Sequence, residues 1–130
     1  MSRGAYRLYP RIPVQVSAVI TTEDGVPNAV ATIDVSRDGL SFECDTMQRN
    51  MITPEGIFVR DGRLVFLFID LDLNNGDGLP FKIVAKCRVV FSRLVSSNKC
   101  KVGLSFVDIE SDIHEQLAQF ITYAFKQTKA

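Results

Sequence analysis

Six consecutive residues combine side-chain types that suit recognition of a ligand: Asp34, Val35, Ser36, Arg37, Asp38 and Gly39. Asp34 and Ser36 follow an apolar run and are two residues apart, so a regular strand would point the carboxylate and the hydroxyl to the same side. Asp38-Gly39 is a strong turn signal, because glycine adopts positive φ angles without steric penalty. The stretch therefore predicts a strand end that presents one acceptor and one hydroxyl before the chain reverses.

A second group of such residues lies near the N-terminus, where Arg7 and Arg11 are four residues apart. Guanidinium groups pair bidentately with phosphate and with the O6/N7 edge of guanine, and they stack on bases. A carboxylate such as Asp34 accepts hydrogen bonds only, which suits the N1–H and N2 amino donors of guanine. We therefore predict that the two stretches meet around one anionic ligand that carries guanine.

Simpler interpretations exist for both stretches. The arginines are compatible with a solvated basic tail, and residues 34–36 are compatible with an Asx-type turn that caps local backbone. Tyr6 and Tyr9, beside the arginines, suit packing on the fold as well as stacking on a ligand. The presence of both stretches together favours the ligand site.

The composition indicates one soluble globular domain. The chain has 130 residues, of which 46% are hydrophobic, and its 15 basic and 15 acidic residues cancel. No apolar run approaches the ~20 residues that span a membrane, and no signal-peptide core begins the chain. A DNA-binding protein more often carries a basic excess. We therefore expect no membrane insertion and no DNA partner.

Three cysteines are present, without the CxxC spacing of zinc sites. Their odd number does not indicate a disulfide framework, and small core positions are the simplest interpretation. A reducing, cytoplasmic location follows as an expectation. No metal-ligand cluster and no nucleophile–base arrangement stands out, so an enzyme is the least supported class.

Hydrophobic periodicity outlines the elements that would position the site. Period-two patterns predict strands over residues 13–20, 26–33, 40–44, 81–92 and 100–106. The run 64–69 is apolar at every position and predicts a central strand buried on both sides. Residues 45–62 show no clean period and are expected to form a loop, with room for a helical turn. Gly103, inside the last strand, suits a bulge or a close backbone approach.

The last segment changes to a helical period, with apolar residues at 113, 117, 120, 121, 124 and 125. We predict a helix over about 113–127 that packs on the sheet. The fold class is then all-β dominated: a six-stranded antiparallel barrel with a C-terminal helix. Prolines at 10 and 13 disfavour a helix at the start, so residues 1–12 are predicted to form a flexible segment and 13–130 the barrel domain.

With these elements in place, the chain resembles the PilZ domain family. The resemblance rests on the RxxxR pair, Arg7 and Arg11, and on the DxSxxG stretch that begins at Asp34, and it extends over nearly the whole chain. It implies a six-stranded barrel with a C-terminal helix and binding of cyclic di-GMP, a bacterial second messenger. The arginines would then contact phosphates and guanines, and Asp34 would accept from a guanine edge.

The resemblance assigns further roles within the same stretches. Ser36 would bond a phosphate or guanine, and Gly39 would shape the turn and let the ligand approach. Many members of the family carry a basic residue immediately before the first arginine, at a position that influences whether one ligand or an intercalated pair binds. Tyr6 occupies that position here, so we include it among the site residues and leave the ligand stoichiometry open.

These observations lead to one functional hypothesis and two alternatives. The hypothesis is a bacterial, cytoplasmic receptor that binds cyclic di-GMP, orders its N-terminal segment and is then recognised by an unidentified protein partner. The first alternative is an adaptor of the same fold that works by protein contact, with weak or no nucleotide binding. The second is a small barrel that binds single-stranded nucleic acid through its interleaved arginines and tyrosines, against which the neutral charge argues.

Overall fold

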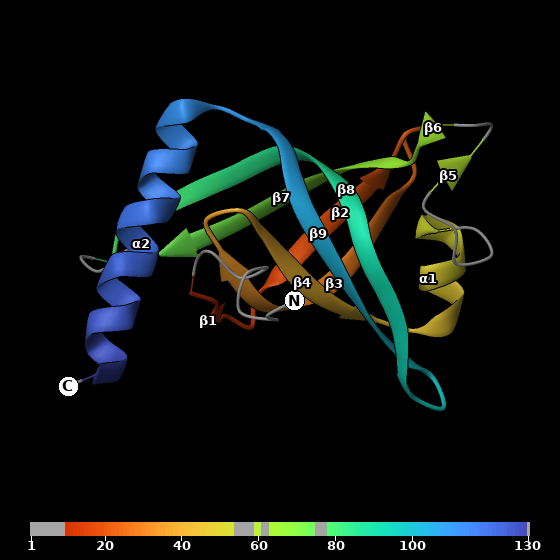
Figure 1. Ribbon diagram of the computed structural model, residues 1–130, viewed down its shortest axis with the longest axis horizontal. Coiled ribbons are helices and arrows are strands. Elements are labelled where there is room, and N and C mark those ends of the chain that lie inside the picture. The colour runs from red at the N-terminus through yellow and green to blue at the C-terminus, as the bar shows by residue number, and fades with distance from the viewer. Residues whose placement is uncertain (1–9, 54–58, 61–62, 75–77, 130) are drawn as a thin grey trace, which may run out of the picture.

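The computed structural model describes residues 10–53, 59–60, 63–74 and 78–129. Six long strands form a closed antiparallel barrel (Figure 1). Around the barrel they are β3 (Pro27–Ser36), β2 (Ser17–Thr22), β7 (Phe66–Asn74), β8 (Pro80–Ser96), β9 (Lys99–Ile109) and β4 (Gly39–Cys44), with β4 pairing back to β3. A short β1 (Ile12–Pro13) pairs with β3, and β5 (Val59–Arg60) pairs with β6 (Arg63–Leu64). The predicted barrel with a C-terminal helix is confirmed.

The core is built by alternation along each strand, because every barrel strand turns one face inward. Ile20, Phe42, Leu67 and Ile83 are each fully buried. The prediction of a strand buried on both sides at 64–69 is wrong. In β7 the residues alternate, and Phe68 is 41% exposed on the outer face. An all-apolar run satisfies the inward positions of a barrel strand without requiring a second buried face.

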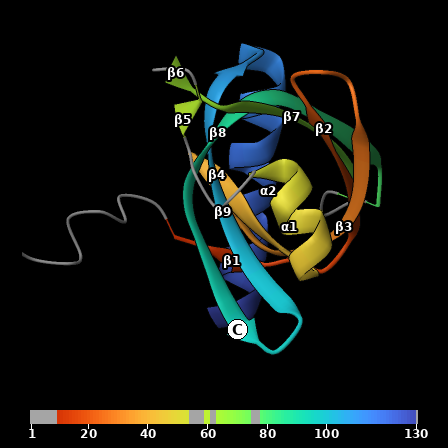
Figure 2. The same ribbon diagram turned by 90° about the vertical axis from the view of Figure 1, so that its right-hand side faces the viewer.

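Two helices lie on opposite sides of the barrel, α1 (Thr46–Ile52) and α2 (Ser111–Lys129) (Figures 1 and 2). The predicted C-terminal helix is confirmed, with Leu117 and Ile121 buried, although Phe125 is 39% exposed. Helix α1 replaces part of the loop expected over 45–62. Its sequence signal is a capping box: the Asp45 carboxylate accepts from the Gln48 backbone N–H, and the Gln48 side chain accepts from the Asp45 backbone N–H.

A bulge in β3 decides which way Asp34 points. The register with β4 shifts between Thr32 and Asp34, so Ile33 is an extra residue on β3. Positions 28, 30 and 32 are buried and positions 29 and 31 are exposed, but after the bulge Val35 becomes the core residue. Without this extra residue, strict alternation would place Asp34 on the same face as Val30. The bulge therefore moves its carboxylate to the outer face.

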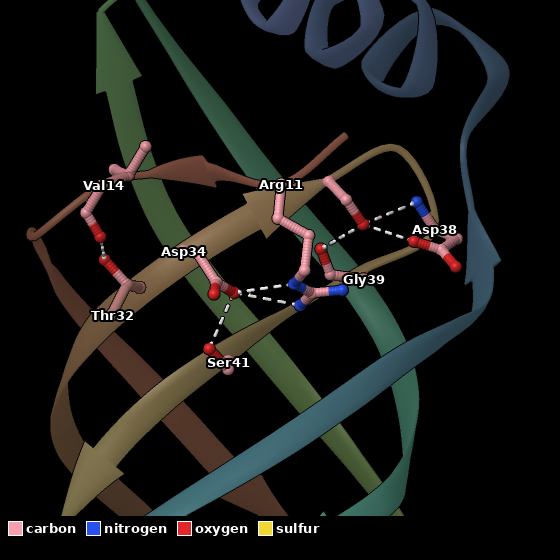
Figure 3. A network of polar contacts seen from close by, with 8 residues as sticks. Arg11, Val14, Thr32, Asp34, Asp38, Gly39 and Ser41 are labelled. Carbon is pink, nitrogen blue, oxygen red and sulfur yellow. Dashed lines mark hydrogen bonds and ion pairs between the residues drawn. The ribbon is translucent and has the colours of Figure 1, made fainter. Parts of the chain in front are cut away.

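The strand predicted over 13–20 is interrupted beside that bulge, because β1 ends at Pro13 and β2 begins at Ser17. The Thr32 side chain forms hydrogen bonds with backbone groups between β1 and β2. Its hydroxyl accepts a hydrogen bond from the Val16 N–H at 2.9 Å. It donates one to the Val14 carbonyl oxygen (Figure 3). The interruption thus keeps its polar groups satisfied while β1 is held against the end of β3.

A second bulge redirects Phe91. The register between β8 and β9 shifts between Val89 and Phe91, which makes Val90 the extra residue. The sequence pattern placed Phe91 on the same face as the core residues 81, 83, 85, 87 and 89, and this prediction is wrong. Phe91 lies opposite Gly103, whose neighbours Val102 and Leu104 face the core. Phe91 is therefore on the outer face of the barrel.

Candidate functional site

One row of residues crosses four strands on the outer face of the barrel. Asp34 on β3 lies opposite Ser41 on β4, Ser41 lies opposite Gly103 on β9, and Gly103 lies opposite Phe91 on β8. Both ends of the row face outward because of the two bulges. Ser41 and Gly103, in the middle of the row, are small, whereas Asp34 and Phe91 at its two ends are larger. We call these ends the two edges of the row, and the surface between them is lower.

Arg11 and Asp34 form an ion pair at the first edge. The guanidinium Nη2 lies 3.0 Å from Asp34 Oδ1, and Nε donates to the same oxygen at 3.1 Å (Figure 3). Ser41 Oγ donates to that oxygen at 2.7 Å. Arg11 stands immediately before β1, whose Ile12 lies opposite Val35, so the strand pairing brings the two charges together.

The environment of Asp34 holds it in the charged form. Burial opposes ionisation, but the hydrogen bonds from Ser41 and Arg11 and the positive charge of Arg11 outweigh it, so the pKa of Asp34 lies below its ordinary value. Within the described part of the chain all three donors converge on Oδ1, and Oδ2 accepts no hydrogen bond. With the carboxylate 18% exposed, Oδ2 remains available to a donor from outside.

Ser36 takes a different place from Asp34, although both belong to the predicted site. Its side chain is fully buried, and its hydroxyl donates to the Asp38 carboxylate and accepts from the Asp38 backbone N–H at 3.3 Å (Figure 3). The Asp38 carbonyl oxygen in turn accepts from the Phe106 N–H at 2.9 Å. The hydroxyl therefore braces the β3–β4 turn, which is the kind of local capping that the sequence left open as an alternative.

Gly39 is a glycine for a reason other than the one predicted from the turn. Its φ angle is not in the left-handed region, which among the described glycines is occupied by Gly25 and Gly78. A Cβ at position 39 would lie 1.9 Å from the Leu104 carbonyl oxygen. The backbones of β4 and β9 approach so closely here that a side chain has no room. The expected positive φ is thus corrected to a close approach between strands.

A pocket of about 480 Å³ lies beside the Arg11–Asp34 pair and runs over β4, β9 and β8. It combines three cationic side chains, one aromatic ring and one acid. Its lining is Arg11, Asp38, Ser41, Arg88, Val90, Phe91, Lys101, Gly103, Leu104 and Ser105. Such a lining suits an anionic ligand with an aromatic part.

The structure brings together only part of the predicted site. Arg11 and Asp34 are in contact, whereas Tyr6, Arg7 and Tyr9 lie outside the described residues. Sequence reasoning missed Ser41, although a two-residue turn at 37–38 sets Asp34 opposite position 41.

Sequence reasoning also missed the pocket residues on β8 and β9. Arg88 and Lys101 carried no distinguishing signal, and the pattern of β8 had assigned Phe91 to the core. Among these residues, only Gly103 had a sequence signal, because its place inside a strand predicted that another part of the chain approaches closely. The group that approaches Gly103 is the Phe91 ring.

Other candidate groups give no second site among the described residues. No cluster of His, Cys, Asp and Glu there could hold a metal ion. The three cysteines are buried and free, and burial raises the pKa of Cys44 and of Cys87 to about 12, which keeps both thiols protonated. His114, at the start of α2, places Nε2 2.7 Å from the Arg37 carbonyl oxygen and so ties the helix to the β3–β4 turn. No helix in the described ranges is long and apolar enough to cross a membrane.

Comparison with known proteins identifies relatives of the whole domain. The family model of the PilZ domain matches residues 5–123. No curated protein gives a significant match. Among solved structures, the chain is similar to the inhibitor of motility MotI/DgrA of Bacillus subtilis, with a TM-score of 0.66, 16% identity, and coverage of 99% of this chain and 53% of that one.

Two further solved structures contain c-di-GMP. The PilZ domain of YcgR from Escherichia coli has a TM-score of 0.57 and 13% identity, and the match covers 95% of this chain and 94% of that one. The PlzA protein of Borreliella burgdorferi has a TM-score of 0.59 and 10% identity, with coverage of 98% and 56%. The chain spans about half the length of MotI/DgrA and of PlzA. At these identities the likeness concerns the fold.

Proposed function

The chain belongs to the PilZ domain family, and on that basis we propose that it is a receptor for cyclic di-GMP, which it binds on the outer face of the barrel. Two structural neighbours, the PilZ domain of YcgR and PlzA, are complexes with this dinucleotide. The proposed site is the Arg11–Asp34 pair together with the adjoining pocket.

The observation that carries the proposal is the contact between Arg11 and Asp34. The two residues are 23 positions apart, yet the guanidinium and the carboxylate lie 3.0 Å apart at the rim of the pocket. An ionised carboxylate with Oδ2 directed to ligand can accept from the N1–H and N2 amino group of one guanine. The guanidinium beside it can hold a phosphate oxygen or the O6/N7 edge.

The remaining predicted site residues have separate roles in the proposal. Arg7 would supply the second guanidinium of the RxxxR pair, and Tyr6 would lie beside it. Ser36 would reach the ligand only if its bond to Asp38 were exchanged, because its hydroxyl is buried in the turn. Gly39 would act by keeping β4 against β9, where the pocket floor begins.

Signal transfer is proposed to use the N-terminal segment, residues 1–12. Its last residues are already placed, because Ile12 lies opposite Val35 and Arg11 contacts Asp34. Cyclic di-GMP bound between Arg7 and Arg11 would hold the preceding residues against the barrel. A protein partner would then recognise the ordered segment, with residues 13–130 serving as the rigid support.

Calorimetric titration with cyclic di-GMP tests the proposal. We expect heat of binding for the parent and an affinity loss of roughly a hundredfold for Asp34→Ala and Arg11→Ala, because each removes a charge-assisted contact to the ligand and breaks the ion pair that positions the other residue. Ligand at ~100 times Kd would raise the free energy of unfolding by about 2.7 kcal/mol. Arg7→Ala measures the contribution of the first arginine.

Lys82→Ala is the matched control, because Lys82 also forms an ion pair with an aspartate, Asp70, at 2.9 Å, but outside the pocket. It should bind like the parent. Absence of binding heat and of thermal stabilisation in the parent would overturn the proposal. A protein partner captured equally with and without the dinucleotide, and equally by Arg11→Ala, would favour the adaptor of the same fold.

A further inference from the structure

We infer that cyclic di-GMP extends from the Arg11–Asp34 edge across β4 and β9 to a second edge, made by Arg88 and Phe91 on β8, and that Lys101 on β9 contacts it between the two edges. The inference rests on the proposed function, since it names the other half of the same site. These residues lie outside both sequence stretches that indicated the ligand, and the strand register alone brings them to it.

The floor between the two edges is made of small residues. The row that starts at Asp34 crosses Ser41 and Gly103 before it reaches Phe91. A parallel row ends at Arg88 after crossing Gly39 and Ser105. Neighbouring strands are about 4.8 Å apart, so the two edges are about 14 Å, or three strand steps, apart along the barrel surface. Arg11 from the first edge lines the same pocket as Arg88 and Phe91, so one ligand can reach both edges.

Phe91 offers an aromatic surface at the second edge. Its ring packs on Gly103, where a Cβ would lie 2.1 Å from Cε2, and the side chain is only half-buried. The Arg93 guanidinium lies 5.6 Å from the ring centroid. An aromatic ring held at the border of a cationic pocket suits stacking with a base, as in proteins that bind single-stranded nucleic acid.

Among the described residues, the two cations of this part of the pocket form no ion pair. Arg88 and Lys101 line the pocket without an ion pair there, whereas Lys82 and Lys99, elsewhere on the surface, are paired with carboxylates. The one acid in the lining is Asp38, whose carboxylate accepts from Ser36. With Asp34, which is paired with Arg11 beside the pocket, three cations face two anions, and the phosphates of a cyclic dinucleotide would neutralise the remaining positive charge.

The test is a set of variants at Arg88, Phe91 and Lys101 with the first edge intact. We expect Arg88→Ala and Lys101→Ala each to raise the Kd for cyclic di-GMP at least about tenfold and to reduce its salt dependence. Phe91→Leu keeps the apolar cover over Gly103 but lacks a π face, and should raise Kd several-fold, while Phe91→Tyr should bind like the parent.

Lys86→Ala is the matched control, because Lys86 is also on β8 and two residues from Arg88 but does not line the pocket. Thermal melts of each variant without ligand separate loss of binding from loss of fold. If the parent binds and Asp34→Ala abolishes binding, while Arg88→Ala, Lys101→Ala and Phe91→Leu all retain the Kd of Lys86→Ala, the inference is overturned and the proposed function stands. A parent that binds no cyclic di-GMP overturns both.

Discussion

Asp34 and Gly39 belong to the same hairpin, but their environments in the barrel are opposite. Asp34 is partly exposed, with polar partners from two other segments, Arg11 before β1 and Ser41 on β4. Gly39 is buried, and a Cβ at this position would overlap the Leu104 carbonyl oxygen of β9. One residue presents a charge to the outside, and the other permits two backbones to approach.

The difference shows that a short sequence motif can combine residues that contact a ligand with residues that maintain the local structure. In the stretch 34–39, Asp34 is suited to contact a ligand, whereas Ser36 braces the turn and Gly39 lets β4 approach β9. Substitutions in the two groups should therefore affect different measurements. Loss at Asp34 should appear in binding, and loss at Gly39 should appear first in folding stability.

The largest effect on stability is expected for Gly39→Ala. The new methyl group would overlap a backbone carbonyl of β9, which cannot move without disturbing the β4–β9 pairing. We expect the free energy of unfolding to fall by about 3 kcal/mol, measured by chemical denaturation. Gly103→Ala is the comparison, because the three atoms nearest to its methyl would all belong to the Phe91 ring, a side chain that can shift. Equal losses for the two variants would contradict the backbone explanation.

An intermediate effect is expected for Ser36→Ala. The variant loses the hydroxyl bond to the Asp38 carboxylate and the acceptor for the Asp38 N–H, so unfolding should become easier by about 2 kcal/mol. If Ser36 only braces the turn, affinity for cyclic di-GMP at a temperature where the variant is folded should change less than threefold. A larger loss of affinity with parental stability would instead place Ser36 among the ligand contacts and weaken the contrast with Asp34.

The smallest effect is expected for Ser41→Ala, and it depends on pH. Since the folded-state pKa of Asp34 is lowered, ionised Asp34 stabilises the fold above its unfolded pKa of about 3.9, and this stabilisation is lost as pH falls through the folded pKa. Removing the Ser41 bond should raise the pKa of Asp34. It should cost about 1 kcal/mol at pH 7, because Arg11 still holds the same oxygen twice.

Titration of the Asp34 carboxyl by carbon NMR, with denaturation at pH 7 and pH 3, would measure both consequences of Ser41→Ala. The stability difference between parent and variant should shrink at the lower pH. Ser41→Thr, which keeps the hydroxyl, serves as the control. An unchanged Asp34 titration in Ser41→Ala would show that the serine does not orient the carboxylate.

Much of the fold could be predicted from the sequence because its patterns are local. Period-two alternation and turn residues indicated most of the barrel strands, and the helical period from Ile113 indicated α2. Helix α1 was missed because its seven residues are too few to show a helical hydrophobic period. The capping box of Asp45 and Gln48 was nevertheless recognisable in the sequence. The division into a flexible segment 1–12 and a barrel 13–130 stays a prediction.

The patterns of the chain were enough to predict alternating strands, a final helix and a pairing of arginine with aspartate. Which other side chains join that pair depends on how the strands are registered in the folded barrel. One extra residue in β3 and one in β8 reverse the alternation and bring Asp34 and Phe91 to the same outer row. The physical reason is that a bulge is defined by register with a neighbouring strand, which local hydrophobic pattern does not encode.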